Sequence, residues 1–166
     1  MAKEKTLQNL EDAFAGESQA NRKYLAFAKK ADEEGYKQAA KLFRAAAEAE
    51  TIHAHNHLAV MGEIKSTKEN IEAAINGETF EFTKMYPEMI KQADADGEKD
   101  AKRSFNFANK VEEVHAKLFK NASENLSSLK DEEIHVCPVC GNTFVGKAPE
   151  KCPICGADKA RFILIK

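Results

Sequence analysis

Residues 42–57 read "LFRAAAEAETIHAHNH", and this stretch decides the predicted fold class. From Leu42 onward, the residues of one face recur at steps of three and four, which is typical of an amphipathic helix. That face begins apolar and then carries Glu50, His53 and His57. The pattern therefore predicts a helix whose inward face changes from packing residues to groups that can hold a metal ion.

Helical geometry separates inward from outward side chains in this stretch. At 3.6 residues per turn, His55 is displaced by about 200° from His53 and belongs to the outer face. Glu48 also falls off the stripe. His57 taken by itself is better explained as a core histidine, or as one that supports a ligand. Glu50 and His53 are therefore the candidate ligands.

The same test over residues 101–126 selects Glu112 rather than Glu113 and places His115 three residues later. Two predicted helices thus carry Glu-x-x-His on their inward faces, and two others carry inward glutamates. The predicted ligands are Glu17, Glu50, His53, Glu78, Glu81, Glu112 and His115.

So many inward carboxylates require cations. Burying a carboxylate costs several kcal/mol unless it is paired, and neighbouring carboxylates repel one another. One acid on an apolar stripe is usually a misjudged boundary, but two Glu-x-x-His pairs with acids on both other helices form the ligand pattern of di-iron bundles. Glutamate oxygens and histidine nitrogens suit iron or manganese better than copper. We therefore predict a dinuclear metal site.

Four long helices are predicted within residues 1–130. Their stripes run over residues 7–28, 39–64, 78–93 and 101–126. Gly35 fits the left-handed position that ends the first helix. With the longest connection between the second and third helices, a four-helix bundle is the leading architecture.

The third helix has two predicted irregularities near it. Ser66 and Glu69 fit a capping box for a short preceding helix, which Gly77 is expected to interrupt. Pro87 lies inside the third helix, where it removes the hydrogen bond to the Thr83 carbonyl, so we expect a kink or bulge.

Residues 131–166 form a second, small predicted domain with all four cysteines. "CPVCG" at 137–141 and "CPICG" at 152–156 give Cys-x2-Cys-x11-Cys-x2-Cys, which is typical of a tetrahedral metal site. So short a segment cannot bury enough apolar surface to fold unaided. Gly141 and Gly156 tolerate positive φ, so each turn can aim N–H groups at sulfur. The predicted ligands are Cys137, Cys140, Cys152 and Cys155; structural zinc and electron-carrying iron both stay open.

Composition excludes some classes of partner. The 166 residues are 43% apolar with a net charge of -2, and neither predicted domain has the basic excess of a nucleic-acid-binding protein. The start "MAKEKTLQNL" has no apolar signal core, and no run of 18 apolar residues occurs. We expect a soluble cytoplasmic protein with no nucleic-acid or membrane partner. In a reducing cytoplasm, clustered cysteines favour metal over disulfides.

Together these motifs resemble the rubrerythrin family, in which a ferritin-like di-iron bundle precedes a rubredoxin-like domain. The resemblance rests on "AGESQANRKY", "EAETIH", "GETFEFTKMYP", "EEVH" and the two CPxCG knuckles, and it covers nearly the whole chain. A generic ferritin-like site needs one acid from the third helix, whereas rubrerythrins have an additional one. The pair Glu78 and Glu81 matches this arrangement of two acids. The resemblance implies that one iron shifts with redox state between the extra glutamate, here Glu81, and His53.

The resemblance also implies a function. It indicates a peroxidase that reduces hydrogen peroxide to water in oxidative-stress defence. Two iron ions would lie in the bundle, and one iron in the four-cysteine site would pass electrons to them; overproduction loads zinc there instead. An external donor, rubredoxin or an NAD(P)H-dependent reductase, would supply the electrons. Tyr24 and Tyr86 are assigned as hydrogen-bond donors to the ligand carboxylates, with core aromatic roles as the alternative.

Three other functions stay open: a ferroxidase or iron-storage protein, an oxygen reductase, and a non-catalytic protein whose zinc ribbon recognises a partner. The fused cysteine module argues against storage, and the buried acids argue against a simple binding module.

We expect a homodimer or higher homo-oligomer in which the thiolate-bound iron of one chain serves the metal pair of another. The fourth helix runs about a dozen residues past His115, roughly 18 Å, so the small domain need not return to its own metal site. Compared with the longer rubrerythrins, the connection between the second and third helices is short, which allows helix pairs to exchange between subunits. Cys140 and Cys152 are also closer together than in free-standing rubredoxins.

Overall fold

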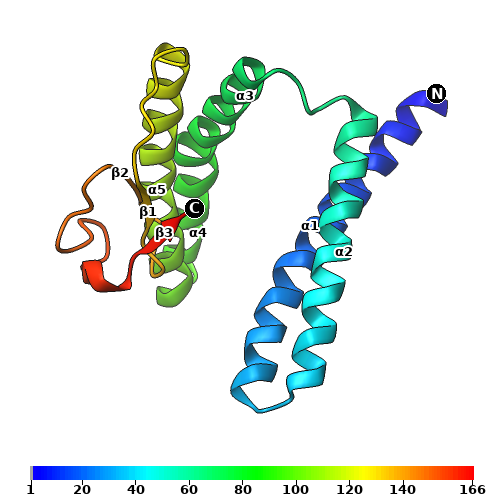
Figure 1. The fold of residues 1–166 in the computed structure, drawn as a ribbon, viewed down its shortest axis with the longest axis horizontal. Coiled ribbons are helices and arrows are strands. Elements are labelled where there is room, and N and C mark those ends of the chain that lie inside the picture. The colour runs from blue at the N-terminus through cyan, green and yellow to red at the C-terminus, as the bar shows by residue number, and fades with distance from the viewer. Residues whose placement is uncertain (1) are drawn as a thin grey trace. The chain divides into compact units, whose positions relative to one another are not determined.

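The computed structural model describes residues 2–166, with side chains from Lys3 onward. It divides into two compact units, the first ending at Lys65 and the second beginning at Ser66 (Figure 1). Each unit is described by itself below. The predicted domain boundary at residues 130/131 stays a prediction.

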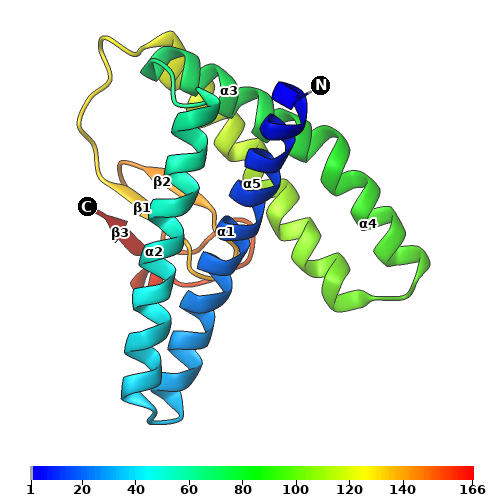
Figure 2. The same ribbon diagram turned by 90° about the vertical axis from the view of Figure 1, so that its right-hand side faces the viewer.

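The first unit is a pair of antiparallel helices, α1 (Ala2–Glu33) and α2 (Lys37–Met61), which lie side by side in Figures 1 and 2. Gly35 has a φ of 83°, which confirms the predicted left-handed turn. Asn21 of α1 links the two helices, because its side-chain amide donates to the Ala47 carbonyl of α2 at 2.7 Å and to the Thr51 hydroxyl of α2 at 2.8 Å.

The seam between α1 and α2 consists of small side chains. The buried alanines are Ala28, Ala31, Ala40, Ala47 and Ala54. Alanines seven residues apart keep to one side of α2, so the two backbones can approach closely. Larger residues of the predicted stripe flank this seam, and Leu42 and Val60 are 69% and 73% exposed. The prediction that the whole stripe is buried is therefore wrong for this hairpin by itself.

The second unit begins with α3 (Thr67–Phe80), a π-helix η1 (Glu81–Met85) and α4 (Tyr86–Ala95), all of which pack on α5 (Lys99–Glu124). The capping box of Ser66 and Glu69 is confirmed. The expected interruption at Gly77 is wrong, because α3 continues through it to Phe80. A glycine weakens a helix without ending it where packing on a neighbour supports it.

The bulge predicted from Pro87 is confirmed. The π-helix ends one residue before Tyr86–Pro87, and the Tyr86 N–H bonds to the Glu81 carbonyl, five residues back. Proline has no N–H for the ordinary pairing with Thr83, so widening the preceding turn is one way to accommodate it. Glu81 lies at the first position of this widened turn.

The chain ends in a small antiparallel sheet of order β2-β1-β3. Its strands are β1 (Ile134–Val136), β2 (Thr143–Val145) and β3 (Ile163–Ile165), with a 3₁₀ turn η2 (Lys159–Arg161) before β3. The rings of Phe144 and Phe162 stack with centroids 5.0 Å apart. The predicted mainly α fold with a small β module is therefore confirmed.

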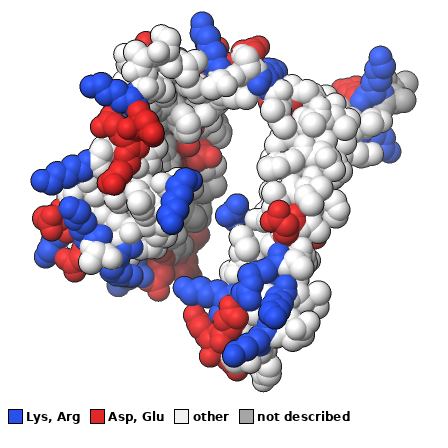
Figure 3. All heavy atoms as spheres, in the orientation of Figure 1, with Lys and Arg blue, Asp and Glu red and all other residues white. Residues whose placement is uncertain are grey.

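The surface and the helices carry no strong bias. On the face drawn in Figure 3, basic and acidic side chains are mixed over both units. Within residues 2–166, no helix is both long enough and apolar enough to cross a membrane.

Candidate metal centres

The first unit brings together Glu17 from α1 and Glu50 and His53 from α2. One potential ligand atom of each lies within 4.8 Å of the others. The Nδ1 atom of His53 is 3.1 Å from a Glu50 oxygen. The Glu50 side chain is 17% exposed and that of His53 is 53% exposed, so the triad lies at the surface of this hairpin.

The two carboxyl groups of this triad shift each other's pKa in opposite directions. A hydrogen bond to Glu50 raises the pKa of Glu17, and burial and the Glu50 charge add to the rise. The same hydrogen bond, followed by one from His53, lowers the pKa of Glu50. The charge of His57 also opposes the rise of the Glu17 pKa, so His57 lies near the triad. It is not one of the three grouped residues. A bound cation would offset the negative charge of both carboxylates.

The second unit brings together Glu78 from α3 with Glu112 and His115 from α5. The Nδ1 atom of His115 lies 2.8 Å from a Glu112 oxygen and 3.7 Å from a Glu78 oxygen. All three side chains are partly buried. Burial first, and then the Glu112 charge, raise the pKa of Glu78.

Glu81 and Tyr86 lie beside this second triad. Burial, followed by the charge of Glu78, raises the pKa of Glu81, while His115 opposes the rise. Burial raises the pKa of the Tyr86 phenol, and the charges of Glu112, Glu81 and Glu78 raise it further. The structure therefore surrounds a protonated phenol with three carboxylates, although Glu81 is not among the three closest ligands.

The predicted hydrogen-bonding roles of the two tyrosines stay predictions. Within residues 2–166, neither hydroxyl makes a hydrogen bond to a ligand carboxylate. The Tyr24 ring packs in an aromatic cluster with Phe27 and Phe43, at centroid distances of 6.4 and 6.2 Å. The Tyr86 ring packs on Phe105 at 6.3 Å.

Residues that the sequence placed on outer faces lie outside both triads. His55 and Glu48 are exposed on α2. Glu113 forms a surface ion pair with Lys117 at 2.6 Å. Helical spacing therefore separated the grouped acids from their sequence neighbours correctly, while the ligand roles of the grouped residues stay predictions.

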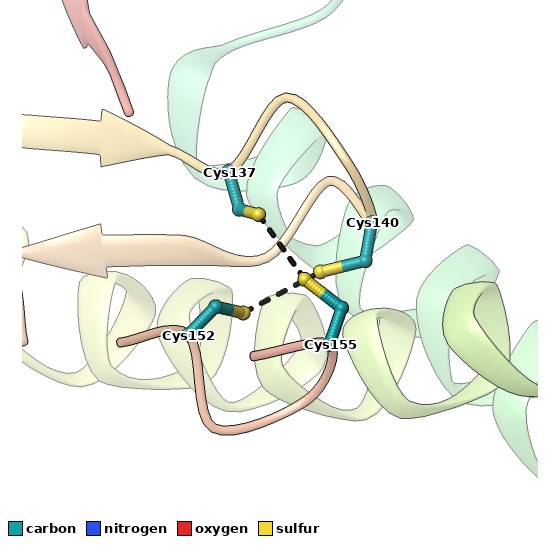
Figure 4. A group of neighbouring side chains, drawn as sticks. All are labelled: Cys137, Cys140, Cys152 and Cys155. Atoms are coloured by element: carbon teal, nitrogen blue, oxygen red, sulfur yellow. Dashed lines mark hydrogen bonds between the residues drawn. The ribbon is translucent and has the colours of Figure 1, made fainter. Parts of the chain in front are cut away.

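The four cysteines converge from the two knuckles (Figure 4). The sulfur of Cys137 is 3.5 Å from that of Cys155, and the sulfur of Cys140 is 3.6 Å from that of Cys152. Ligands 2.3 Å from one ion at tetrahedral angles are about 3.8 Å apart. The spacing of the four sulfurs therefore fits one tetrahedral zinc or iron ion.

Each knuckle has the same backbone hydrogen bonds. Gly141 and Gly156 have φ values of 85° and 77°, and their N–H groups bond to the carbonyls of Cys137 and Cys152, each at 2.8 Å. Burial raises the pKa of Cys140. Burial also acts to raise the pKa of Cys152, but N–H groups of Cys155 and Ile154 reverse this and lower it to about 7. The predicted aim of backbone N–H groups at sulfur is thus present.

Two polar residues that the sequence reasoning missed follow Gly141. Asn142 is 3% exposed, and its side-chain amide points at the Cys152 sulfur at 3.9 Å. The hydroxyl oxygen of Thr143 lies 2.9 Å from Nε2 of His115. A polar residue directly after the glycine of a metal knuckle is a usable sequence signal for Asn142. No periodic pattern links Thr143 to a histidine 28 residues away.

The contact of Thr143 with His115 corrects the expectation that the small module need not return to the metal site of its own chain. The small module does return to the helix that carries Glu112 and His115, since β2 packs on α5. The reason is that the chain reverses after α5 and returns beside this helix, where it forms the antiparallel strands β1 and β2 (Figures 1 and 2).

The donor sets fit metal ions. Each triad offers two carboxylates and one imidazole, and the second has a further carboxylate beside it. Burial is the main cause of the raised pKa values of Glu78 and Glu81, and a hydrogen bond to Glu50 is the main cause at Glu17. In each case the charge of a neighbouring carboxylate adds to the rise of the pKa, and a bound cation would oppose it. Such oxygen and nitrogen ligands suit iron or manganese, and four thiolates suit iron or zinc.

Comparisons with known proteins match both the helical part and the four-cysteine part of the chain. The family model described as "Rubrerythrin" matches residues 8–123, and that described as "Rubrerythrin, rubredoxin-like domain" matches residues 135–163. Rubrerythrin-2 of Clostridium acetobutylicum is 37% identical, with 95% of each chain covered. Nigerythrin of Nitratidesulfovibrio vulgaris is 39% identical, with 95% of this chain and 85% of that protein covered.

Solved structures give the same result. The mixed-valence and fully reduced states of nigerythrin match with TM-scores of 0.60 and 0.61 at 38% identity, covering 96% of this chain and 86% of theirs. These matches, together with the helices and the four-cysteine cluster, support an oxidoreductase built from a ferritin-like helical domain and a rubredoxin-like module. The chain therefore belongs to the rubrerythrin family.

Proposed function

We propose that this protein is a di-iron peroxidase that reduces hydrogen peroxide to water. The observation that carries the proposal is the hydrogen bond between His115 of the second triad and Thr143 of the thiolate module. It holds a group suited to one-electron transfer against a group suited to a two-electron site. A ferroxidase or an iron store has no need of that junction.

The two triads and Glu81 would hold two iron ions. Iron is favoured over manganese because the solved relative nigerythrin is described in a fully reduced, all-ferrous state. When bound, two ferrous ions supply the two electrons that break the O–O bond of peroxide, and with two protons this yields two water molecules.

The chain's own residues would manage charge and protons. Tyr86, whose pKa is raised by burial and by three carboxylates, keeps its proton at neutral pH and can donate a hydrogen bond toward the site. Burial raises the pKa values of Glu78 and Glu81 in the metal-free protein, and a bound metal would favour their charged forms. The single thiolate-bound iron would return electrons one at a time, in two steps. The donor to that iron would be a rubredoxin or an NAD(P)H-dependent reductase.

The decisive experiment is anaerobic peroxide turnover with a chemical reductant and a rubredoxin reductase system. The wild type is expected to consume two electrons per peroxide. Glu112→Gln should abolish turnover while the thiolate site keeps its spectrum, and Cys137→Ser should slow re-reduction while one turnover of the pre-reduced protein survives. Faster turnover with dioxygen than with peroxide would indicate an oxygen reductase instead. Accumulation of mineralised ferric iron would indicate a ferroxidase.

A further inference from the structure

Thr143 holds the histidine of the second triad from the side opposite the carboxylates. Its Oγ1 lies 2.9 Å from Nε2 of His115, and its hydroxyl can donate to the Gly141 carbonyl at 3.4 Å. The other ring nitrogen, Nδ1, faces Glu112 at 2.8 Å and Glu78 at 3.7 Å. The ring of His115 therefore has a polar partner at both nitrogens.

The two ring nitrogens need different partners in different states. A neutral imidazole has one N–H, so one nitrogen donates while the other accepts. In the Nδ1–H tautomer, Nδ1–H donates to the Glu112 carboxylate and Nε2 accepts from the Thr143 hydroxyl, which is the arrangement we expect without metal. A cation on Nδ1 requires the proton on Nε2, which then donates to Oγ1 of Thr143, while the hydroxyl hydrogen turns to Gly141.

A hydroxyl suits both states because it donates and accepts. A backbone carbonyl would satisfy only Nε2–H, and a methyl group would satisfy neither form. Thr143 is also firmly placed, since it lies in β2 and pairs with Val136 of β1. A partner that fixes ring orientation typically strengthens metal binding by an imidazole.

We propose that Thr143 is a positioning residue that keeps the His115 ring in place while its tautomer changes between the metal-free and metal-bound states. The proposal rests on the proposed function only in taking His115 as a metal ligand. It assigns no redox step to Thr143.

The test uses the full chain labelled with ¹⁵N-histidine, with zinc first bound to the thiolate site. Further Zn²⁺ is titrated while the ring nitrogen resonances of His115 are followed by NMR. The variants are Thr143→Val, which keeps the shape without the hydroxyl, Thr143→Ser, and Thr67→Val at an exposed helix start as the matched control. The resonances of the three-stranded sheet report folding.

In the wild type, Thr143→Ser and Thr67→Val, His115 should change from the Nδ1–H to the Nε2–H form as zinc binds. Thr143→Val should show mixed tautomers before zinc and bind zinc at His115 ~10-fold to 100-fold more weakly. Unchanged resonances and affinity in Thr143→Val would overturn the proposal, as would a defect that Thr143→Ser does not restore. A wild type that shows the tautomer change with zinc, but shows no peroxide turnover when it is separately loaded with iron, would support this role and overturn the proposed function.

Discussion

Asn142 gives the thiolate site a side-chain donor in addition to its backbone donors. Its amide points at the Cys152 sulfur. Because Asn142 is only 3% exposed, little water competes with the amide for this sulfur. An N–H group aimed at sulfur stabilises the reduced site more than the oxidised one, because the reduced site is more negative.

We therefore predict that Asn142→Leu lowers the reduction potential of iron in the thiolate site. The expected fall is on the order of 40 mV, the equivalent of ~1 kcal/mol for a one-electron couple. Protein voltammetry measures it, with Asn9→Leu, an exposed change on α1, as the control. A potential that stays at the wild-type value would show that this amide does not act on the sulfur.

Glu81 should make the metal-free protein sensitive to pH. Burial, and then Glu78, raise its pKa above the ordinary 4.5. A carboxyl group whose pKa is raised in the folded state stabilises the fold below its unfolded pKa, and this contribution is lost as the pH rises through the folded pKa. The metal-free protein should therefore lose stability from about pH 4.5 upward.

Glu81→Gln should remove the contribution of Glu81 to this loss of stability at higher pH. In the presence of a chelator, we expect its Tm to exceed that of the wild type by about 1–3 °C at pH 7 and to equal it at pH 4, by calorimetry. With iron loaded the sign should reverse, because a predicted ligand is missing. The exposed Glu88→Gln serves as the control. An equal Tm difference at both pH values would contradict this account.

At the scale of elements, the π-helix sets where Glu81 lies relative to Tyr86. Pro87 follows the π-helix and lacks the N–H that α-helical pairing to Thr83 needs. Returning residues 81–85 to α-helix would turn the preceding residues by about 100° relative to those that follow.

We predict that Pro87→Ala converts this turn to α-helix, seen in backbone chemical shifts, and raises the free energy of unfolding of the metal-free protein by up to ~3 kcal/mol. This change would move Glu81 away from its present position relative to Tyr86, so the iron content should fall. Pro149→Ala, in the loop between the knuckles, should do neither. Persistence of the π-helix in Pro87→Ala would mean that other contacts hold it.

At the scale of the whole molecule, the predicted ligands of the metal pair divide between the two units, with three in the first unit and four in the second. The first unit also exposes large apolar side chains, including Leu42, Val60 and Ile64, that its own hairpin does not cover. Apolar faces of this kind are usually buried against another element. We predict a homodimer in which the first unit of one chain completes the metal site with the second unit of its partner.

Mixing two inactive variants tests this exchange. Glu50→Ala damages the first unit and Glu112→Ala damages the second. If helix pairs exchange, refolding the two together should restore iron binding and turnover at one site per mixed dimer. Mixing Glu50→Ala with His53→Ala should restore nothing, since both changes lie in one unit. Mixed dimers that form without regaining a site would rule out the exchange.

Local sequence periodicity predicted the helical class, the grouping of the acids and histidines, the bulge near Pro87 and the four-cysteine cluster. The face on which each acid or histidine lies follows from 3.6 residues per turn along one helix, and the shape of each cysteine knuckle follows from the glycine conformation in its turn. The distinction between His53 and His55, or Glu112 and Glu113, needs no knowledge of the neighbouring elements.

Only the tertiary structure decided which part of each stripe is buried and what the small module touches. Alanine spacing, rather than the larger apolar residues, sets the α1–α2 seam, because close backbone approach depends on both helices together. The contact of Thr143 with His115 depends on the path of the chain after α5 and on the sheet register. Such long-range contacts arise from packing between elements, which no local period encodes.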